Sequence, residues 1–216
     1  MATSPFEGRL VRRYVALGDS FTAGAPGTED GKRWPDELAA ALRSANPELD
    51  YRNLGVAGAT TEEVAAGQLE PCIRLRPDLV TVVSGANDVL LSVRPDIGAH
   101  AAALGVIFGL LRTELPHAAV VTATTPQLST FIELHPRSRR RVERGVLALN
   151  EATRSVARRH GVLCLEFAEH PQAAERDNFA DDGFHPSATG VRRAARACAR
   201  AISTHFGIRV IQEEPA

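Results

Sequence analysis

The sequence predicts an α/β protein in which a parallel sheet lies between two layers of helices. Short apolar runs alternate with longer segments of helical periodicity along the chain, and this alternation is typical of β-α-β units. The chain of 216 residues is 44% hydrophobic, which is enough to bury one core. No repeat, low-complexity tract or shift in composition divides it. We therefore expect residues 1–216 to form a single domain, with its core at about residues 13–207.

Five apolar runs are predicted to form the strands. Each is short, rich in aliphatic residues and bounded by residues that favour turns, as expected for strands buried on both faces. The predicted strands are Arg13–Gly18, Asp50–Val56, Asp78–Ser84, Ala118–Thr124 and Val162–Phe167.

Segments with helical periodicity lie between the predicted strands. Apolar residues recur every three or four positions over residues 34–45, and again over residues 142–156. The last helix is predicted to begin after Ser187, whose hydroxyl can cap its N-terminus, and to end at Gly207.

Charge and hydropathy exclude several kinds of partner. A formal net charge of -1 leaves no broad basic field for a nucleic-acid backbone or an anionic membrane. The longest apolar run, Ala101–Leu111, is shorter than the roughly 20 residues that span a bilayer. The N-terminal segment does not resemble a secretory signal, so we expect a cytoplasmic protein. The cysteines Cys72, Cys164 and Cys198 form no metal-ligand pattern, and no metal site is predicted.

Four segments carry residues that can do chemistry at the carboxyl ends of the strands, where ligands bind in open parallel sheets. They are GDS with Ser20, NLGVAGATT with Gly58, SGAND with Asn87 and DDGFHPSATG with His185. Taken singly, each residue has an ordinary structural use, because serine and asparagine form turns and caps and glycine adopts left-handed turns. Their combination at one end of the sheet indicates a reaction.

The combination supplies each part that nucleophilic acyl transfer needs. Ser20 provides a hydroxyl, and His185 a base that can take its proton. Asp182 precedes His185 by three residues on the same loop, so its carboxylate can fold back to the far imidazole nitrogen. The backbone amides of Ser20 and Gly58, with the side-chain amide of Asn87, can donate to a developing oxyanion.

In this order, the four segments resemble the Ser, Gly, Asn and His blocks of the SGNH hydrolase superfamily, also called GDSL-type lipases and esterases. The matching segments are Gly18–Gly24 (GDSFTAG), Asn53–Thr61 (NLGVAGATT), Gly85–Asp88 (GAND) and Asp181–Gly190 (DDGFHPSATG). Two departures occur. Phe21 replaces the leucine of the first block, and the Gly block contains both Gly55 and Gly58, of which Gly58 fits the family's spacing better.

The resemblance implies a flavodoxin-like sheet with strand order 2-1-3-4-5. It also implies a Ser-His-Asp triad of Ser20, His185 and Asp182, with Ser20, Gly58 and Asn87 forming the oxyanion hole. The implied activity is that of a serine esterase that cleaves acyl or acetyl esters of small molecules through an acyl-enzyme, without a metal or cofactor.

Alternative functions remain open at this point. An acyltransferase or a thioesterase would use the same triad. A metal-dependent phosphoesterase would use a ligand set that leaves Ser20 without a role: Asp19, Asn87, Asp88, Asp182 and His185. A non-enzymatic binding module on a flavodoxin-like fold would leave the DDGFHP segment unexplained.

Two long connections follow predicted strands, and long loops in compact domains are often functional. They are Ala25–Arg33 and Pro126–Arg137. The second contains four apolar residues that either line an acyl pocket or cover the core: Leu128, Phe131, Ile132 and Leu134.

Overall fold

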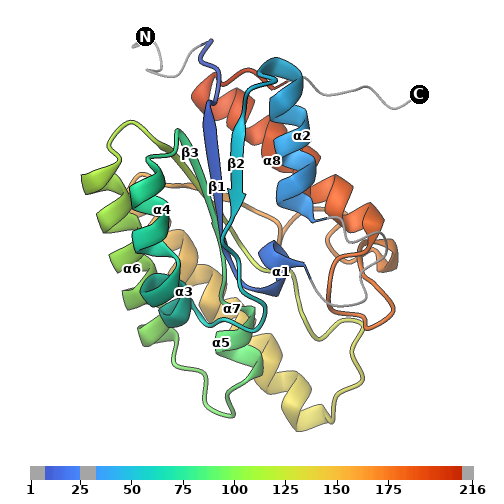
Figure 1. The fold of residues 1–216 in the computed structure, drawn as a ribbon. Coiled ribbons are helices and arrows are strands. Elements are labelled where there is room, and N and C mark those ends of the chain that lie inside the picture. The colour runs from blue at the N-terminus through green and yellow to red at the C-terminus, as the bar shows by residue number, and fades with distance from the viewer. Residues whose placement is uncertain (1–7, 25–32, 211–216) are drawn as a thin grey trace.

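The computed structural model describes residues 8–24 and 33–210 as three layers, with a sheet between two groups of helices (Figure 1). Five parallel strands form the sheet in the order β2-β1-β3-β4-β5. The strands are β1 Arg13–Gly18, β2 Asp50–Asn53, β3 Leu79–Val83, β4 Ala119–Ala123 and β5 Leu163–Leu165. The predicted α/β class and strand order are therefore confirmed.

The first strand has the predicted bounds, whereas the other four are shorter than predicted. Their ends leave the sheet to form loops. After β2, for example, the side-chain oxygen of Asn53 accepts a hydrogen bond from the Gly55 amide at 2.9 Å and turns the chain. Apolar periodicity continues through such a turn, so hydropathy alone places the end of the strand too late.

Side chains of the central strands alternate between two cores. On β1, Tyr14 and Ala16 pack toward α2 and α8, while Val15 and Leu17 pack toward the opposite helices. The helices of the first face are α2 Trp34–Ala45 and α8 Ala188–Phe206, and those of the second are α3 Thr61–Gly67, α4 Leu69–Leu75, α6 Ile97–Glu114 and α7 Pro136–Arg159. Burial on both faces explains why the strands are nearly continuous apolar runs.

Two short helices, α1 Ser20–Ala23 and α5 Ala86–Leu90, directly follow the carboxyl ends of β1 and β3. Figure 1 shows both at the same end of the sheet. The predicted helix over residues 34–45 is confirmed as α2, and α7 extends beyond residues 142–156 at both ends. The ends of α8 are as predicted, because the Ser187 hydroxyl accepts from the Gly190 amide at 3.1 Å and Gly207 has a φ of 67°.

The apolar run Ala101–Leu111 lies inside α6, where Leu104, Ile107 and Phe108 are buried against the sheet. Within residues 8–24 and 33–210, no helix combines the length and apolar character that a membrane crossing requires. The first long connection, Ala25–Arg33, falls outside the described residues except for Arg33.

Candidate active site

Ser20 is held at the carboxyl end of the sheet by the way β1 ends. Gly18 has a φ of 152°, and a Cβ at this position would lie 2.0 Å from the carbonyl oxygen of Val83. Only glycine therefore lets β1 end this close to β3. The next residue, Asp19, caps α1 by accepting the Phe21 amide at 3.0 Å. Ser20 follows as the first residue of α1.

His185 lies on a loop that is closed by its own backbone hydrogen bonds. Phe179 and Pro186 form an isolated antiparallel bridge. Within this bridge, the Ala180 amide donates to the His185 carbonyl at 2.8 Å. Directly after it, the Ser187 amide donates to a carbonyl on the opposite side of the loop. The backbone of His185 is thus fixed just before α8 begins.

The structure brings Ser20, His185 and Asp182 into one hydrogen-bonded chain. The Nε2 atom of His185 lies 3.1 Å from the Ser20 Oγ, and its Nδ1 lies 2.6 Å from the Asp182 Oδ2. The other Asp182 oxygen accepts the backbone amides of Phe184 and His185 at 2.8 and 2.9 Å. Partial burial acts to raise the pKa of Asp182, but these hydrogen bonds outweigh it and hold the pKa below its ordinary value. The neighbouring Asp181 is exposed.

The two glycines of the Gly block have different environments. The Gly55 amide is occupied by Asn53, and a Cβ on Gly55 would lie 2.8 Å from the Ala23 nitrogen. Gly58 has a φ of 84° and open space around it, and its amide has no hydrogen-bond partner among the described residues. Gly58 is therefore the better placed of the two to donate to a ligand.

Asn87 lies in α5 and is 8% exposed. Its Nδ2 donates to the Ala59 carbonyl at 3.0 Å, which joins the Asn block to the Gly block. Only one of the two amide hydrogens is needed for this bond, so the other can point to a ligand.

Behind these donors lies a buried polar cluster that sequence reasoning missed. The Thr61 amide and hydroxyl donate to the Asp88 Oδ2 at 3.0 and 3.1 Å, which ties the start of α3 to α5. The fully buried His100 places its Nδ1 2.8 Å from the Thr61 Oγ1 and its Nε2 3.0 Å from the Thr153 Oγ1. A lone histidine inside an apolar helix gave no signal for this cluster, because its partners lie 39 and 53 residues away.

Burial lowers the pKa of His100 to about 4, although Asp88 lies 4.0 Å from its Nδ1. In the unfolded chain the imidazole takes up a proton at about pH 6.5. Between these values only the unfolded state is protonated, so stability is lost as the pH falls from about 6.5 to about 4. We expect the stability advantage of the wild type over His100→Gln to shrink by about 3 kcal/mol between pH 7 and pH 4.

Denaturant unfolding of both proteins at several pH values measures this change. The quantity to compare is the difference in unfolding free energy between the two proteins at each pH. Burial also raises the pKa of Asp19 to about 7, which gives an opposite pH dependence, but this contribution is common to both proteins and cancels in the difference. His117→Gln is the control, since His117 is exposed. A wild-type advantage over His100→Gln that stays constant with pH would contradict the assignment.

Several of the candidate metal ligands form hydrogen bonds with one another or with neighbouring residues. Asp182 binds His185, and Asp88 binds Thr61. In the part of the chain that the structure describes, no three His, Cys, Asp or Glu side chains come together as a metal site.

A cavity of about 140 Å³ lies next to the Ser20 loop, but the four apolar residues predicted for an acyl pocket do not line it. Leu128 is 1% exposed and packs with Leu134 in a core cluster against α5 and α7. The Phe131 ring contacts Phe179 at a centroid distance of 5.1 Å, so Phe131 lies behind a cavity wall. Leu128 and Leu134 thus serve packing, and the acyl-pocket interpretation of the four residues stays a prediction.

A hydroxyl, an imidazole and a carboxylate thus lie in hydrogen-bonded sequence at the carboxyl end of a five-stranded parallel sheet. This arrangement is typical of α/β enzymes that transfer acyl groups, a class that includes ester hydrolases. Comparison with known proteins supports this class. Residues 16–193 match the model of the GDSL-like Lipase/Acylhydrolase family. The chain belongs to this family, and it is an ester hydrolase.

Several solved structures share the fold. A lipase/acylhydrolase from Enterococcus faecalis superposes with a TM-score of 0.72 at 20% identity, covering 94% of this chain and 100% of that one. An acetyl-xylooligosaccharide esterase mutant from a Geobacillus species gives 0.70 at 20% identity, covering 97% and 99%. The esterase EstA from a Pseudoalteromonas species, inhibited by monoethylphosphonate, gives 0.68 at 15% identity, covering 90% and 98%. No curated protein matches the chain.

Proposed function

We propose that the protein cleaves carboxylic esters of small molecules by a Ser-His-Asp mechanism, with Ser20 as the nucleophile. The observation that carries this proposal is the unbroken chain from the Ser20 Oγ through both nitrogens of His185 to the Asp182 Oδ2, at 3.1 and 2.6 Å. Both distances are within hydrogen-bond reach for a nucleophile, its base and the group that orients the base.

In the first half of the proposed reaction, the Ser20 oxygen attacks the ester carbonyl while the His185 Nε2 takes the hydroxyl proton. The tetrahedral intermediate collapses, and the same proton passes to the departing alcohol oxygen, which leaves an acyl group on Ser20. In the second half, His185 takes a proton from water as the water oxygen attacks this acyl group. The proton returns to Ser20 as the carboxylic acid leaves. Asp182 keeps Nδ1 protonated and favours the imidazolium.

The negative charge of each tetrahedral intermediate develops on the former carbonyl oxygen. We propose that the backbone amides of Ser20 and Gly58 and the side chain of Asn87 donate to it. The Gly58 amide, which has no hydrogen-bond partner in the described part of the chain, and the second amide hydrogen of Asn87 support this assignment. Such donors are effective because they are already oriented before charge develops.

Replacing Asn87 with alanine tests the oxyanion assignment. Removal of one donor is expected to lower kcat by about 10² to 10³ and to leave KM nearly unchanged, because the donor acts mainly in the transition state. Steady-state kinetics on a 4-nitrophenyl ester measures both constants.

Asn46→Ala is the matched control for this variant. The Asn46 Nδ2 also donates to a backbone carbonyl, that of Val11 at 2.8 Å, which precedes β1 at the opposite end of the sheet. This variant loses a similar hydrogen bond without touching the site, so its kcat should stay within a factor of about two of the wild-type value. A raised KM with unchanged kcat in Asn87→Ala would overturn the oxyanion role.

A further inference from the structure

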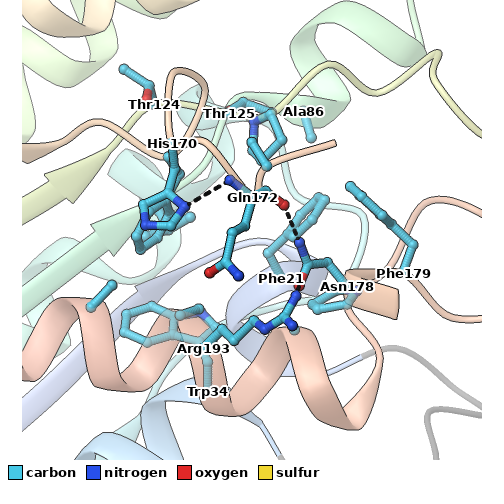
Figure 2. Close-up of a pocket in the computed structure, with 18 of the residues that line it drawn as sticks. Phe21, Trp34, Ala86, Thr124, Thr125, His170, Gln172, Asn178, Phe179 and Arg193 are labelled. Carbon is cyan, nitrogen blue, oxygen red and sulfur yellow. Dashed lines mark hydrogen bonds between the residues drawn. The ribbon is translucent and has the colours of Figure 1, made fainter. Parts of the chain in front are cut away.

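The cavity beside the Ser20 loop offers a binding site that the triad does not explain. It lies on the face of the sheet covered by α2 and α8, and Figure 2 shows its lining. Asp19 and Phe21, the chain neighbours of Ser20, both line the cavity, as does Pro186, the residue after His185. The cavity therefore adjoins the segments that carry Ser20 and His185, although neither of these two residues lines it.

The walls of this cavity are mostly carbon. Aromatic rings and small α8 residues dominate the lining: Phe21, Trp34, Phe167, Phe179, Ala194 and Ala197. The cavity volume is about 140 Å³. An apolar protein cavity of about 150 Å³ accommodates a benzene molecule. The matching group in a substrate is apolar and contains about six carbon atoms.

Part of the cavity lining is held by a chain of hydrogen bonds, which Figure 2 marks. The backbone N–H of Gln172 donates to the His170 Nδ1 at 3.2 Å. The backbone carbonyl of Gln172 accepts from the Asn178 Nδ2 at 2.6 Å. Arg193 on α8 then donates to the Asn178 Oδ1 at 2.8 Å. These bonds hold part of the lining in place before binding, and a preformed apolar cavity favours a ligand that fills it.

Asp19 is the acidic residue in the lining, and it is 1% exposed. Its Oδ2 has no hydrogen-bond partner among the described residues. Burial raises the pKa of Asp19 to about 7, so its uncharged form is favoured far more than in an exposed carboxyl. A neutral carboxyl is compatible with an alkyl neighbour, whereas a fixed charge is not.

We propose that this cavity binds an apolar group of about six carbon atoms in the ester substrate. The inference rests on the proposed function, because it places this group next to the ester that Ser20 attacks. It assigns Ala194, Ala197 and Phe167 as residues that determine chain length. The group belongs to either the acyl or the alcohol part of the ester, and the test separates these two sources.

The first test fills the cavity. Each methylene that enters an apolar site raises kcat/KM by about fourfold, so in the series whose chain enters the cavity the wild type should prefer six-carbon to four-carbon chains by about 15-fold. Ala194→Leu adds bulk to the cavity wall, and this preference should fall to about one. The control Ala148→Leu makes the same substitution at an exposed position of α7 and should keep the wild-type ratio.

The second test enlarges the cavity. Phe167→Ala should move the optimum to octanoyl or decanoyl esters, opposite in direction to Ala194→Leu. General damage to the protein would lower activity on all esters alike, so opposite shifts cannot arise from it.

One substrate series varies the acyl chain of 4-nitrophenyl esters, and the other varies the alcohol of linear alkyl acetates. The series that responds identifies which part of the ester occupies the cavity.

Ser20→Ala separates failure of this inference from failure of the proposed function. Activity that depends on Ser20, together with chain-length ratios that both cavity variants leave unchanged in both series, would overturn the cavity assignment alone. Activity that survives in Ser20→Ala would overturn the proposed function. Opposite shifts in at least one series, with activity lost in Ser20→Ala, would support both.

Discussion

Ser20→Ala is expected to lower kcat on any ester substrate by about 10⁶, the scale found when a serine nucleophile is removed from a working triad. The Ser20 Oγ is the atom that faces the His185 Nε2 at 3.1 Å. Without it, the base has no hydroxyl to deprotonate and no acyl-enzyme can form. Any residual rate over the uncatalysed reaction would come from substrate binding and the oxyanion donors.

The fold should survive this substitution. Ser20 is 8% exposed, and its neighbours Gly18 and Asp19 hold the turn through backbone contacts and a cap that do not involve the serine hydroxyl. Ser44→Ala is the control, because Ser44 is an exposed serine on α2. Unfolding midpoints of both variants should stay near the wild-type value. A Ser20→Ala protein that keeps more than a few per cent of wild-type kcat would contradict the nucleophile assignment.

Asp182→Asn is expected to lower kcat by up to about 10⁴, the scale found when the orienting carboxylate of a triad becomes an amide. Both Asp182 oxygens are acceptors, one for the His185 Nδ1 and the other for the Phe184 and His185 amides. An asparagine must turn its NH₂ group toward one of these sides. If it faces Nδ1, the imidazole is held in the tautomer that cannot accept the Ser20 proton.

Asp181→Asn is the matched control, since it makes the same change in the adjacent, exposed residue. Its kcat should stay within a factor of about three of the wild type, as is usual for surface substitutions. Measuring kcat for both variants separates three outcomes. A large loss at Asp182 alone supports the triad, a larger loss at Asp181 reverses the assignment, and small losses at both favour a Ser-His dyad.

Much of the candidate site could be predicted because its residues lie in short, ordered segments at the ends of strands. Gly18, Ser20 and Asn87 follow apolar runs whose direction in a parallel sheet fixes where they emerge. Asp182 and His185 are close in sequence, so a tight loop is sufficient to join them. For these residues, local pattern and global topology lead to the same position.

The cavity could not be predicted in this way, because it joins distant parts of the chain. Trp34, Phe167 and Ala194 come from α2, the segment after β5 and α8. Nothing in their local spacing indicates that they share a space. Conversely, Leu128 lies in a connection that looks functional from its length, yet its side chain fills the core. Which apolar residues line a cavity and which fill a core depends on packing between elements, and periodicity does not report it.

The proposed mechanism requires that Ser20 becomes covalently modified during the reaction. A fluorophosphonate probe tests this, because phosphorus accepts the nucleophile's oxygen and fluoride leaves, which gives a stable adduct. Trypsin should then release the segment Tyr14–Lys32, in which Ser20 is the serine. We predict one adduct per chain on this peptide, with fragment ions that place it on Ser20 and with activity lost in proportion. Inactivation with the adduct on another peptide, or full activity after Ser20 is labelled, would contradict the account.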